Sequence, residues 1–242
     1  MTSAIPIPDP ERRHAERRAA DTEARHLANT LAITTEAALA VSSLEGPHTF
    51  CELARHLARL AGVDAAMIAV YVDPVDGQEQ RMHTVGTWVD GKALRPFDYE
   101  GARTPCRFVI GRETRYAPQG VHHEFDPDTL FFAQGFDAYA ARSLLDSAGR
   151  PLGLIAVINR QPLHDRHLIE LLLRIFGIRA AAEFERERDG RALRLREEQY
   201  RAIFNASADA LVLWDNDMRI VDVNPACMQT VSYTHLTLPT KA

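Results

Sequence analysis

The side chains most able to do chemistry gather in the stretch "HHEFDPD". It offers five metal-capable groups within seven residues: His122, His123, Glu124, Asp126 and Asp128. Adjacent residues in one loop rarely converge on a single ion, and their spacing matches no zinc or calcium pattern. We therefore predict a solvated loop here and no metal site.

The three cysteines are Cys51, Cys106 and Cys227, and none forms a C-x-x-C or other close pair. This spacing provides neither a disulfide framework nor a zinc motif, and it favours a reducing, cytoplasmic setting. Cys106 follows Pro105 in an irregular region, so it is a candidate for a reactive thiol or for lining a ligand pocket. We favour a small, partly buried apolar role, because reactivity depends on a local field that sequence does not reveal.

Two aromatic residues, Trp88 and Tyr139, fall on predicted strands. Aromatic rings can stack on a small ligand, but they supply the same apolar area to a core, which is the role we favour. Trp88, Cys106 and Tyr139 are thus the candidate pocket residues, and no cofactor is assigned. Because no G-x-S-x-G, P-loop or Ser/His/Asp signature is present, we do not expect the chain itself to be an enzyme.

The composition is that of an ordinary soluble protein, with 46% hydrophobic and 25% charged residues. A net charge of -5 gives no reason to expect nucleic-acid binding. The N-terminus lacks the basic start and apolar stretch of a signal peptide, and no apolar run is long enough to span a membrane.

The elements that must position these residues begin with a helix over about 11–43. A second helix follows, where Thr49 and Glu52 have the spacing of a capping box and Gly62 supplies the stop. The segments 65–72 and 80–89 read as strands, and 95–135 is irregular: "CRFVIG" reads as a short helix or strand and "DPDTLFFAQG" as a short helix.

The second half of the chain opens with a hairpin, in which "AYAARSLLD" pairs with "PLGLIAVIN" across the turn "SAGR". A long helix over 164–204 follows. Its weak heptad carries Arg179, Arg186, Asp189 and Arg196 on the same seam, which argues against a tight coiled coil. Two short strands then flank the turn "DND", and Pro225 opens a last helix.

This order of elements resembles a GAF domain, a small-molecule sensing fold of signalling proteins. The hairpin carries the resemblance, because Asp146, Gly149, Gly153, Ile155 and Val157 fit a D-x-x-G turn followed by an "xGxIAV" strand. The resemblance implies an α+β fold, with an antiparallel sheet flanked by helices and a long exit helix. The flanking residues expected around a bilin-bearing cysteine of phytochromes are not seen at Cys106.

Residues 197–226 resemble the opening of a PAS domain, with Ile220, Val223, Asn224 and Ala226 in the run "I-x-x-V-N-x-A". We accordingly divide the chain into five segments. They are a disordered or helical segment 1–24, a GAF sensory domain 25–163, a connecting signalling helix 164–198, a truncated PAS part 199–230, and a tail 231–242.

The tail "VSYTHLTLPTKA" is Thr-rich and carries Lys241, one of only two lysines in the chain. Back-translated, it admits the sequence of a transposase-type sequencing adapter. We interpret residues 231–242 as a library artefact that cuts the last helix short.

The resemblance implies a sensory input region of a bacterial signal-transduction protein. A small ligand or dimerisation through helices 11–43 and 164–204 would act on a PAS domain and on an output domain, such as a histidine kinase or a diguanylate cyclase. Two alternatives stay open: a structural dimerisation module without a ligand, and a GAF-fold reductase that uses cysteines, for which Cys51 and Cys106 show no matching motif.

Overall fold

A computed structural model describes residues 10–44, 46, 48–72, 81–109, 114–121 and 134–236. The chain divides after Glu183, within a long helix, into two compact units. The helices are α1 (Pro10–Ser43), α2 (Thr49–Ala61), η1 (Gly101–Arg103), η2 (Pro105–Phe108), α3 (Arg166–Ala206) and α4 (Pro225–Leu236). The strands are β1 (Ala65–Tyr71), β2 (Arg81–Val89), β3 (Lys92–Ala93), β4 (Asp98–Glu100), β5 (Thr114–Ala117), β6 (Ala138–Leu145), β7 (Pro151–Asn159), β8 (Val212–Trp214) and β9 (Ile220–Val223).

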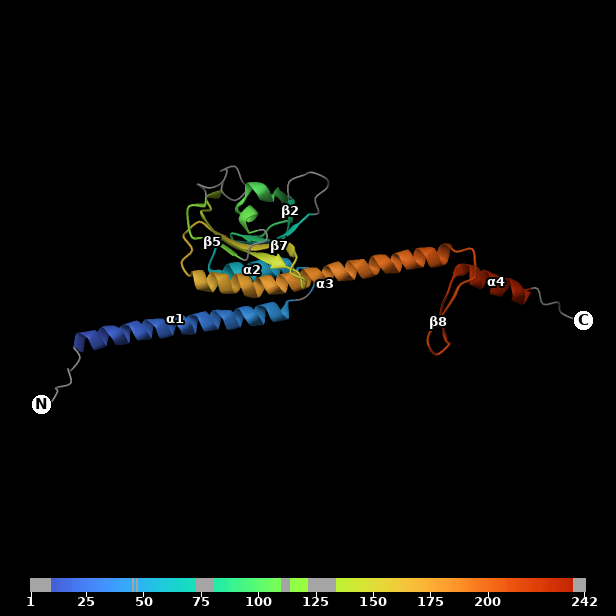
Figure 1. Ribbon diagram of the computed structural model, residues 1–242, viewed down its shortest axis with the longest axis horizontal. Coiled ribbons are helices and arrows are strands. Elements are labelled where there is room, and N and C mark those ends of the chain that lie inside the picture. Colours follow the sequence, from blue (N-terminus) through green and yellow to red (C-terminus); the bar gives the residue numbers. More distant parts are fainter. Residues whose placement is uncertain are drawn as a thin grey trace, which may run out of the picture. The chain divides into compact units, whose positions relative to one another are not determined.

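The first unit is built on an antiparallel sheet with the strand order β3-β2-β1-β7-β6-β5, to which β4 adds beside β2. The predicted hairpin is confirmed as β6 and β7, and the predicted strands at 65–72 and 80–89 are confirmed as β1 and β2. Figure 1 shows α2 and α3 on one side of the sheet and the short turns η1 and η2 on the other. The α+β architecture expected from the sequence is therefore present.

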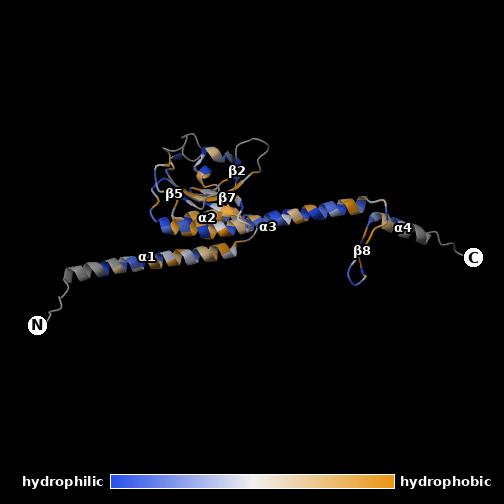
Figure 2. Ribbon diagram, in the orientation of Figure 1, coloured by the Kyte–Doolittle hydropathy of each residue, from blue (hydrophilic) through white to orange (hydrophobic). Residues whose placement is uncertain are grey.

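Both faces of the central strands are buried, as the hydropathy colouring of Figure 2 illustrates. Ile155 and Leu144 face α3 at Gly177, where an added methyl group would lie 3.3 and 3.4 Å from their side chains. The alternate residues Met67, Leu154 and Ala156 belong to a core on the opposite face. Side chains alternate across a strand, so the sheet separates two packed layers.

The start of α2 corrects one expectation. Thr49 is the first residue of the helix, and its hydroxyl donates to the Gly46 carbonyl at 2.7 Å. Glu52 pairs with Arg55 at 2.6 Å and does not reach back to form the predicted capping box. Gly62 does end the helix in the left-handed region, with φ of 64°.

Three further expectations concern the irregular middle and the last helix, and the described residues test two of them. "CRFVIG" begins within the short 3-10 helix η2, and the predicted helix "DPDTLFFAQG" lies almost wholly outside the described residues. Helix α4 continues through Leu236, so the expectation that the tail cuts this helix short at residue 230 is wrong for the backbone.

The second unit contains the end of α3, the two-stranded sheet β8–β9 and α4. Asn224 is fully buried and joins three of these parts: its Oδ1 accepts from the backbone N–H groups of Leu211 (2.8 Å) and Cys227 (3.0 Å), and its Nδ2 donates to the Phe204 carbonyl (3.2 Å). Among the described residues, no helix is both long enough and apolar enough to cross a membrane.

Candidate ligand-binding site

A group of three tyrosines and one cysteine lies within the core on the face of the sheet opposite α2 and α3. Tyr139 on β6 donates its hydroxyl to Cys106 Sγ at 3.5 Å, and the Tyr99 hydroxyl lies 3.5 Å from the same sulfur. Tyr71, at the end of β1, packs against this core, and its hydroxyl has no hydrogen-bond partner. We call Tyr71, Tyr99, Tyr139 and Cys106 the tyrosine–cysteine cluster.

Local structure fixes Cys106 in this position. Pro105 opens the turn η2, and the Thr104 hydroxyl accepts a hydrogen bond from the Cys106 N–H at 3.3 Å. The Thr104 hydroxyl also donates to the Gly101 carbonyl at 2.9 Å, which ties η2 to η1. Cys106 is only 2% exposed, so its thiol points into the core and is shielded from solvent.

The walls of the cluster are mostly apolar. They are contributed by strands β1, β2, β6 and β7 and by the segments around η2, and include Met67, Met82, Val89, Val109, Val121, Phe136 and Leu154. A second hydroxyl without a partner lies on this face: Thr87 pairs with Met67 across β1 and β2, is 1% exposed, and has no hydrogen-bond partner for its hydroxyl. Unpartnered buried hydroxyls are rare in folded proteins and call for a physical explanation.

Burial raises the pKa values of the three tyrosines. It raises the pKa of Tyr71 to about 12, with a smaller contribution from the nearby Cys106. The same desolvation raises the pKa values of Tyr99 and Tyr139 well above their ordinary range. A tyrosine with its ordinary pKa of about 10 is already neutral at physiological pH, and burial widens that margin, so all three hydroxyls can donate hydrogen bonds.

Two arginines stand at the border of this site. The guanidinium groups of Arg107 and Arg115 lie 4.5 and 4.4 Å from the centre of the Phe108 ring. Arg115 alternates along β5 onto the same face as Ala117, whose partner across the sheet is Tyr139. Positive charge thus lies beside the cluster, and no lysine or arginine is among the buried residues that the structure describes.

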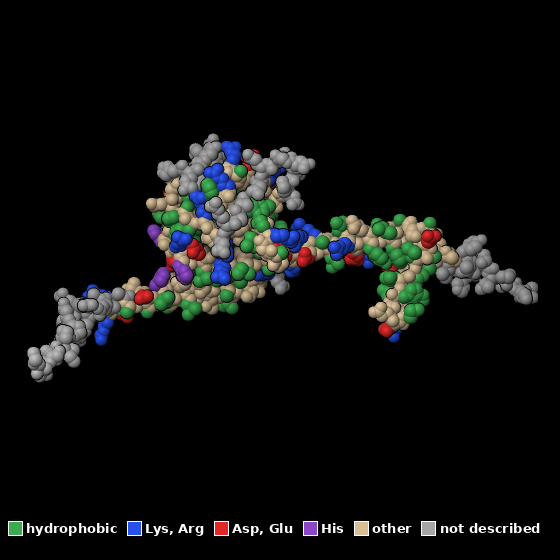
Figure 3. Space-filling view, in the orientation of Figure 1, with side chains coloured by type: hydrophobic (Ala, Val, Ile, Leu, Met, Phe, Trp, Pro, Cys, Tyr) green, Lys and Arg blue, Asp and Glu red, His purple; other side chains and the backbone are tan. Residues whose placement is uncertain are grey.

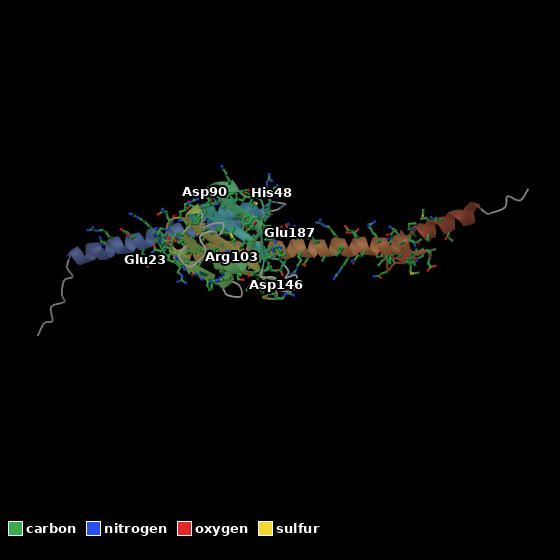
Figure 4. All side chains as sticks on the ribbon, turned by 90° about the horizontal axis from the view of Figure 1, so that it is seen from above. Glu23, His48, Asp90, Arg103, Asp146 and Glu187 are labelled. Carbon is green, nitrogen blue, oxygen red and sulfur yellow. The ribbon has the colours of Figure 1, made fainter. Side chains whose placement is uncertain are left out.

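The structure brings together only two of the three predicted pocket residues. Cys106 and Tyr139 are in contact, whereas Trp88 lies on the other face, in an open groove of about 450 Å³ lined by Arg55, Arg59 and Asp90. Asp90 is labelled in Figure 4, and its carboxylate is paired with Arg160 at 2.7 Å. The sequence did not predict this separation, because a strand buried on both faces does not reveal which side each residue takes.

Sequence reasoning did not identify Tyr71, Tyr99 and Thr87. Tyr71 and Thr87 sit in strands that were predicted, but their shared face becomes visible only in the β1–β2 register, which shifts between Ile68 and Ala69. Tyr99 lies in the segment that the sequence left irregular. Cys106, which the sequence did single out and whose sulfur lies 3.5 Å from the Tyr99 hydroxyl, was the available signal.

Other polar groups lie outside the tyrosine–cysteine cluster. A second groove of about 430 Å³, on the α3 side, is lined by Arg142, Arg166, Arg174 and Glu170. Within the described part of the chain, no three His, Cys, Asp or Glu side chains gather closely enough to hold a metal ion. All seven residues of the "HHEFDPD" stretch lie outside the described residues.

A comparison with family models finds a GAF domain over residues 47–184, more than half of the chain. The chain belongs to the GAF domain family. A PAS domain model follows over residues 198–241, as the sequence predicted. This second match includes most of the segment 231–242, whose origin in an adapter stays a prediction. Both matched models describe sensory domains.

Solved structures support the same fold. The GAF domain of a phosphoenolpyruvate-protein phosphotransferase from Coxiella burnetii matches with a TM-score of 0.55 at 16% identity, covering 68% of this chain and 97% of that one. The photosensory core module of Stigmatella aurantiaca phytochrome matches at 0.52 and 13% identity, covering 73% and 40%.

The bacteriophytochrome RpBphP3 from R. palustris matches at a TM-score of 0.51 and 14% identity, covering 74% of this chain and 43% of that one. The GAF chain thus spans less than half of each of these two phytochromes. No curated protein matches it.

Proposed function

We propose that this chain is the sensory input region of a bacterial, cytoplasmic signal-transduction protein. In this proposal a small ligand binds the GAF domain at the tyrosine–cysteine cluster, and α3 passes the change to the PAS domain. An output domain such as a histidine kinase or a diguanylate cyclase would lie elsewhere in the parent protein.

The observation that carries the proposal is the unpartnered Tyr71 hydroxyl in the buried cluster. A core made only for packing gains nothing from a hydroxyl that lacks a partner, since burying it costs free energy. A ligand that completes the hydrogen bond would stabilise one conformation over another, and such differential affinity is what a sensor requires.

A thermal-shift screen of the full chain tests the proposal. Cyclic nucleotides, haem and common metabolites would be added singly, because a ligand that binds only the folded state raises the melting temperature. We expect at least one concentration-dependent increase that Tyr71→Phe reduces. Silence across the screen would favour the alternative of a dimerisation module without a ligand.

A specific observation supports dimerisation. Helix α1 exposes Leu27, Leu31 and Leu39 at 61–68%, and α3 exposes Leu193 and Ile203 at 68% and 75%. Large apolar side chains on exposed helices are typical of contact surfaces. We propose a homodimer through helices 11–43 and 164–204, and size-exclusion chromatography with light scattering measures its mass.

Matched variants sharpen this second test. Leu27→Glu together with Leu31→Glu should convert the dimer to a monomer, whereas Leu94→Glu, at a side chain outside both helices that is 40% exposed, should leave the mass unchanged. A wild-type chain that is a strict monomer at high concentration contradicts the dimer.

The cysteine-dependent reductase has little support. Cys51 lies on α2, which packs on the face of the sheet opposite Cys106, so the sheet stands between the two thiols. A measurable turnover that disappears in Cys106→Ser would revive it.

A further inference from the structure

The Tyr71 hydroxyl differs from its two neighbours in the cluster. Tyr99 and Tyr139 both direct their hydroxyls at Cys106 Sγ, whereas the Tyr71 Oη is buried and has no partner. Tyr71 faces the same side of the sheet as Thr87, the second unpartnered hydroxyl, since their register partners Met82 and Met67 share one core. The face thus holds two buried donors without acceptors.

The surroundings of these hydroxyls define what could meet them. Apart from the cluster and a few threonines, the buried side chains of this core are apolar. Among the described residues, the buried charged side chains are Asp146, in the turn between β6 and β7, and Glu183, on α3, and neither belongs to this core. Placing an ion there without a countercharge is strongly unfavourable. Both donors are neutral near physiological pH, and burial raises the pKa of the Tyr71 hydroxyl further, to about 12.

Arg115 marks the limit of this neutral region. Its guanidinium stacks on Phe108 at 4.4 Å, is only partly buried and acts electrostatically on Tyr139, so it would hold a negatively charged ligand at this border. The position of the arginine therefore separates two ligand classes that an experiment can distinguish.

We infer that the cluster recognises a small uncharged molecule carrying a hydrogen-bond acceptor, which the Tyr71 hydroxyl binds as donor. This inference rests on the proposed sensory function and specifies the ligand class of that site. Thr87 provides a second donor position on the same face, and Cys106 stays hydrogen-bonded to Tyr99 and Tyr139.

The test uses the full chain and three one-ring probes: pyridine, which is uncharged near neutral pH and carries an acceptor nitrogen, benzene, which has the same shape without it, and benzoate, an anion. Affinities are measured by NMR titration. We expect Tyr71→Phe to weaken pyridine about fivefold to tenfold, the effect of one neutral hydrogen bond, and to leave benzene unchanged. The exposed Tyr200→Phe should change neither.

Every outcome of this titration either supports or contradicts the inferred ligand class. Equal effects of Tyr71→Phe on pyridine and benzene, or benzoate binding more tightly than pyridine, overturn the ligand class, even if a metabolite from the thermal screen still binds. If no probe binds, the inference fails, and the proposed function fails with it only if the metabolite screen is also silent. Should Tyr71→Phe not fold, Thr87→Val provides the second variant, with the same selective loss of pyridine expected.

Discussion

Tyrosine ionisation links the buried cluster to stability. The pKa of Tyr71 is raised from 10.0 to about 12 by burial, and those of Tyr99 and Tyr139 are raised by the same cause. An unfolded chain loses these protons at lower pH than the folded one, so the unfolded state binds fewer protons above the ordinary tyrosine value. The folded state therefore keeps its full stability only at pH values below the ordinary tyrosine pKa, where the tyrosines are protonated in both states.

We therefore predict that the free energy of unfolding falls as pH rises from about 10 towards 12. Urea denaturation at several alkaline pH values measures it, and tyrosinate absorbance follows the ionisation. Tyr71→Phe should make the decline shallower, whereas Tyr200→Phe should not. A decline that is identical in wild type and Tyr71→Phe would show that Tyr71 is not protected.

Gly153 is the glycine of the "xGxIAV" strand, and the structure gives its physical reason. A Cβ at this position would collide with the Ala69 carbonyl on β1, a backbone atom that cannot move independently. At Gly190 in α3, by contrast, a Cβ would meet nothing within 4 Å. One glycine is thus required by close strand approach, and the other only weakens a helix.

The two glycines give a paired prediction. Gly153→Ala should lower the free energy of unfolding by about 1–3 kcal/mol through overpacking, and Gly190→Ala should raise helix stability by about 0.5–1 kcal/mol. Denaturation followed by circular dichroism measures both. A neutral Gly153→Ala would mean that β1 and β7 can separate without loss.

The sequence predicted some of these residue-scale features and not others. The turn residues of the hairpin were predicted because their bonds are local: Asp146 Oδ1 accepts from the N–H groups of Ala148 and Arg150 at 3.0 and 2.8 Å. The meeting of Tyr71, Tyr99 and Cys106 could not be predicted, since it depends on strand register and on a segment without periodicity.

At the scale of elements, the C-terminal end of α1 is stabilised by a side chain from another helix. Helix α1 has no basic residue in its last turn to complement its free carbonyl groups. Arg179 on α3 supplies that charge, because its Nε donates to the Val41 carbonyl at 3.1 Å and its Nη2 to the Leu44 carbonyl at 2.6 Å. Its third contact is with Glu183 at 2.8 Å, a carboxylate that is 1% exposed.

This arrangement predicts that Arg179→Gln loosens the end of α1. The variant loses the charged hydrogen bonds to the Val41 and Leu44 carbonyls, and hydrogen bonds to charged groups contribute about 1.5–3 kcal/mol each. Hydrogen exchange at residues 38–44 should accelerate markedly in the variant. Arg174→Gln, at an exposed position on the same helix, provides the control, and unchanged exchange in Arg179→Gln would remove the proposed tie between α1 and α3.

The sequence predicted both helices but not their connection. Arg179 was interpreted as a residue that weakens a heptad seam, whereas it contacts backbone atoms 138 and 135 positions away. Periodicity reports which face of a helix is apolar, and it carries no information on a carbonyl group contributed by another helix.

At the scale of the whole molecule, the two units differ in how much they bury. The first encloses layers on both faces of its sheet. In the second, Phe204 and Asn224 are the buried residues among those described, and Trp214 and Ile220 are 50% and 58% exposed. Figure 3 shows acidic and basic side chains together along α3, the helix that runs through both units.

The second unit is therefore predicted to open first. An isolated two-stranded sheet is marginal in water, and local stability follows the number of buried apolar contacts. In hydrogen exchange on the full chain, the amides of β8 and β9 should exchange orders of magnitude faster than those of β1 and β7. Urea should likewise produce a first transition confined to residues 184–236, before the sheet of the first unit unfolds.

The opposite result would be equally informative. If β8 and β9 were protected as strongly as β1, the exposed face that carries Trp214 and Ile220 would have to be covered in solution. A concentration series separates the sources of such protection, since a covering second copy loses its effect on dilution, whereas a fold internal to the chain does not. The dimer proposed through α1 and α3 predicts protection on those helices alone, so the position of any concentration-dependent protection decides which surface associates.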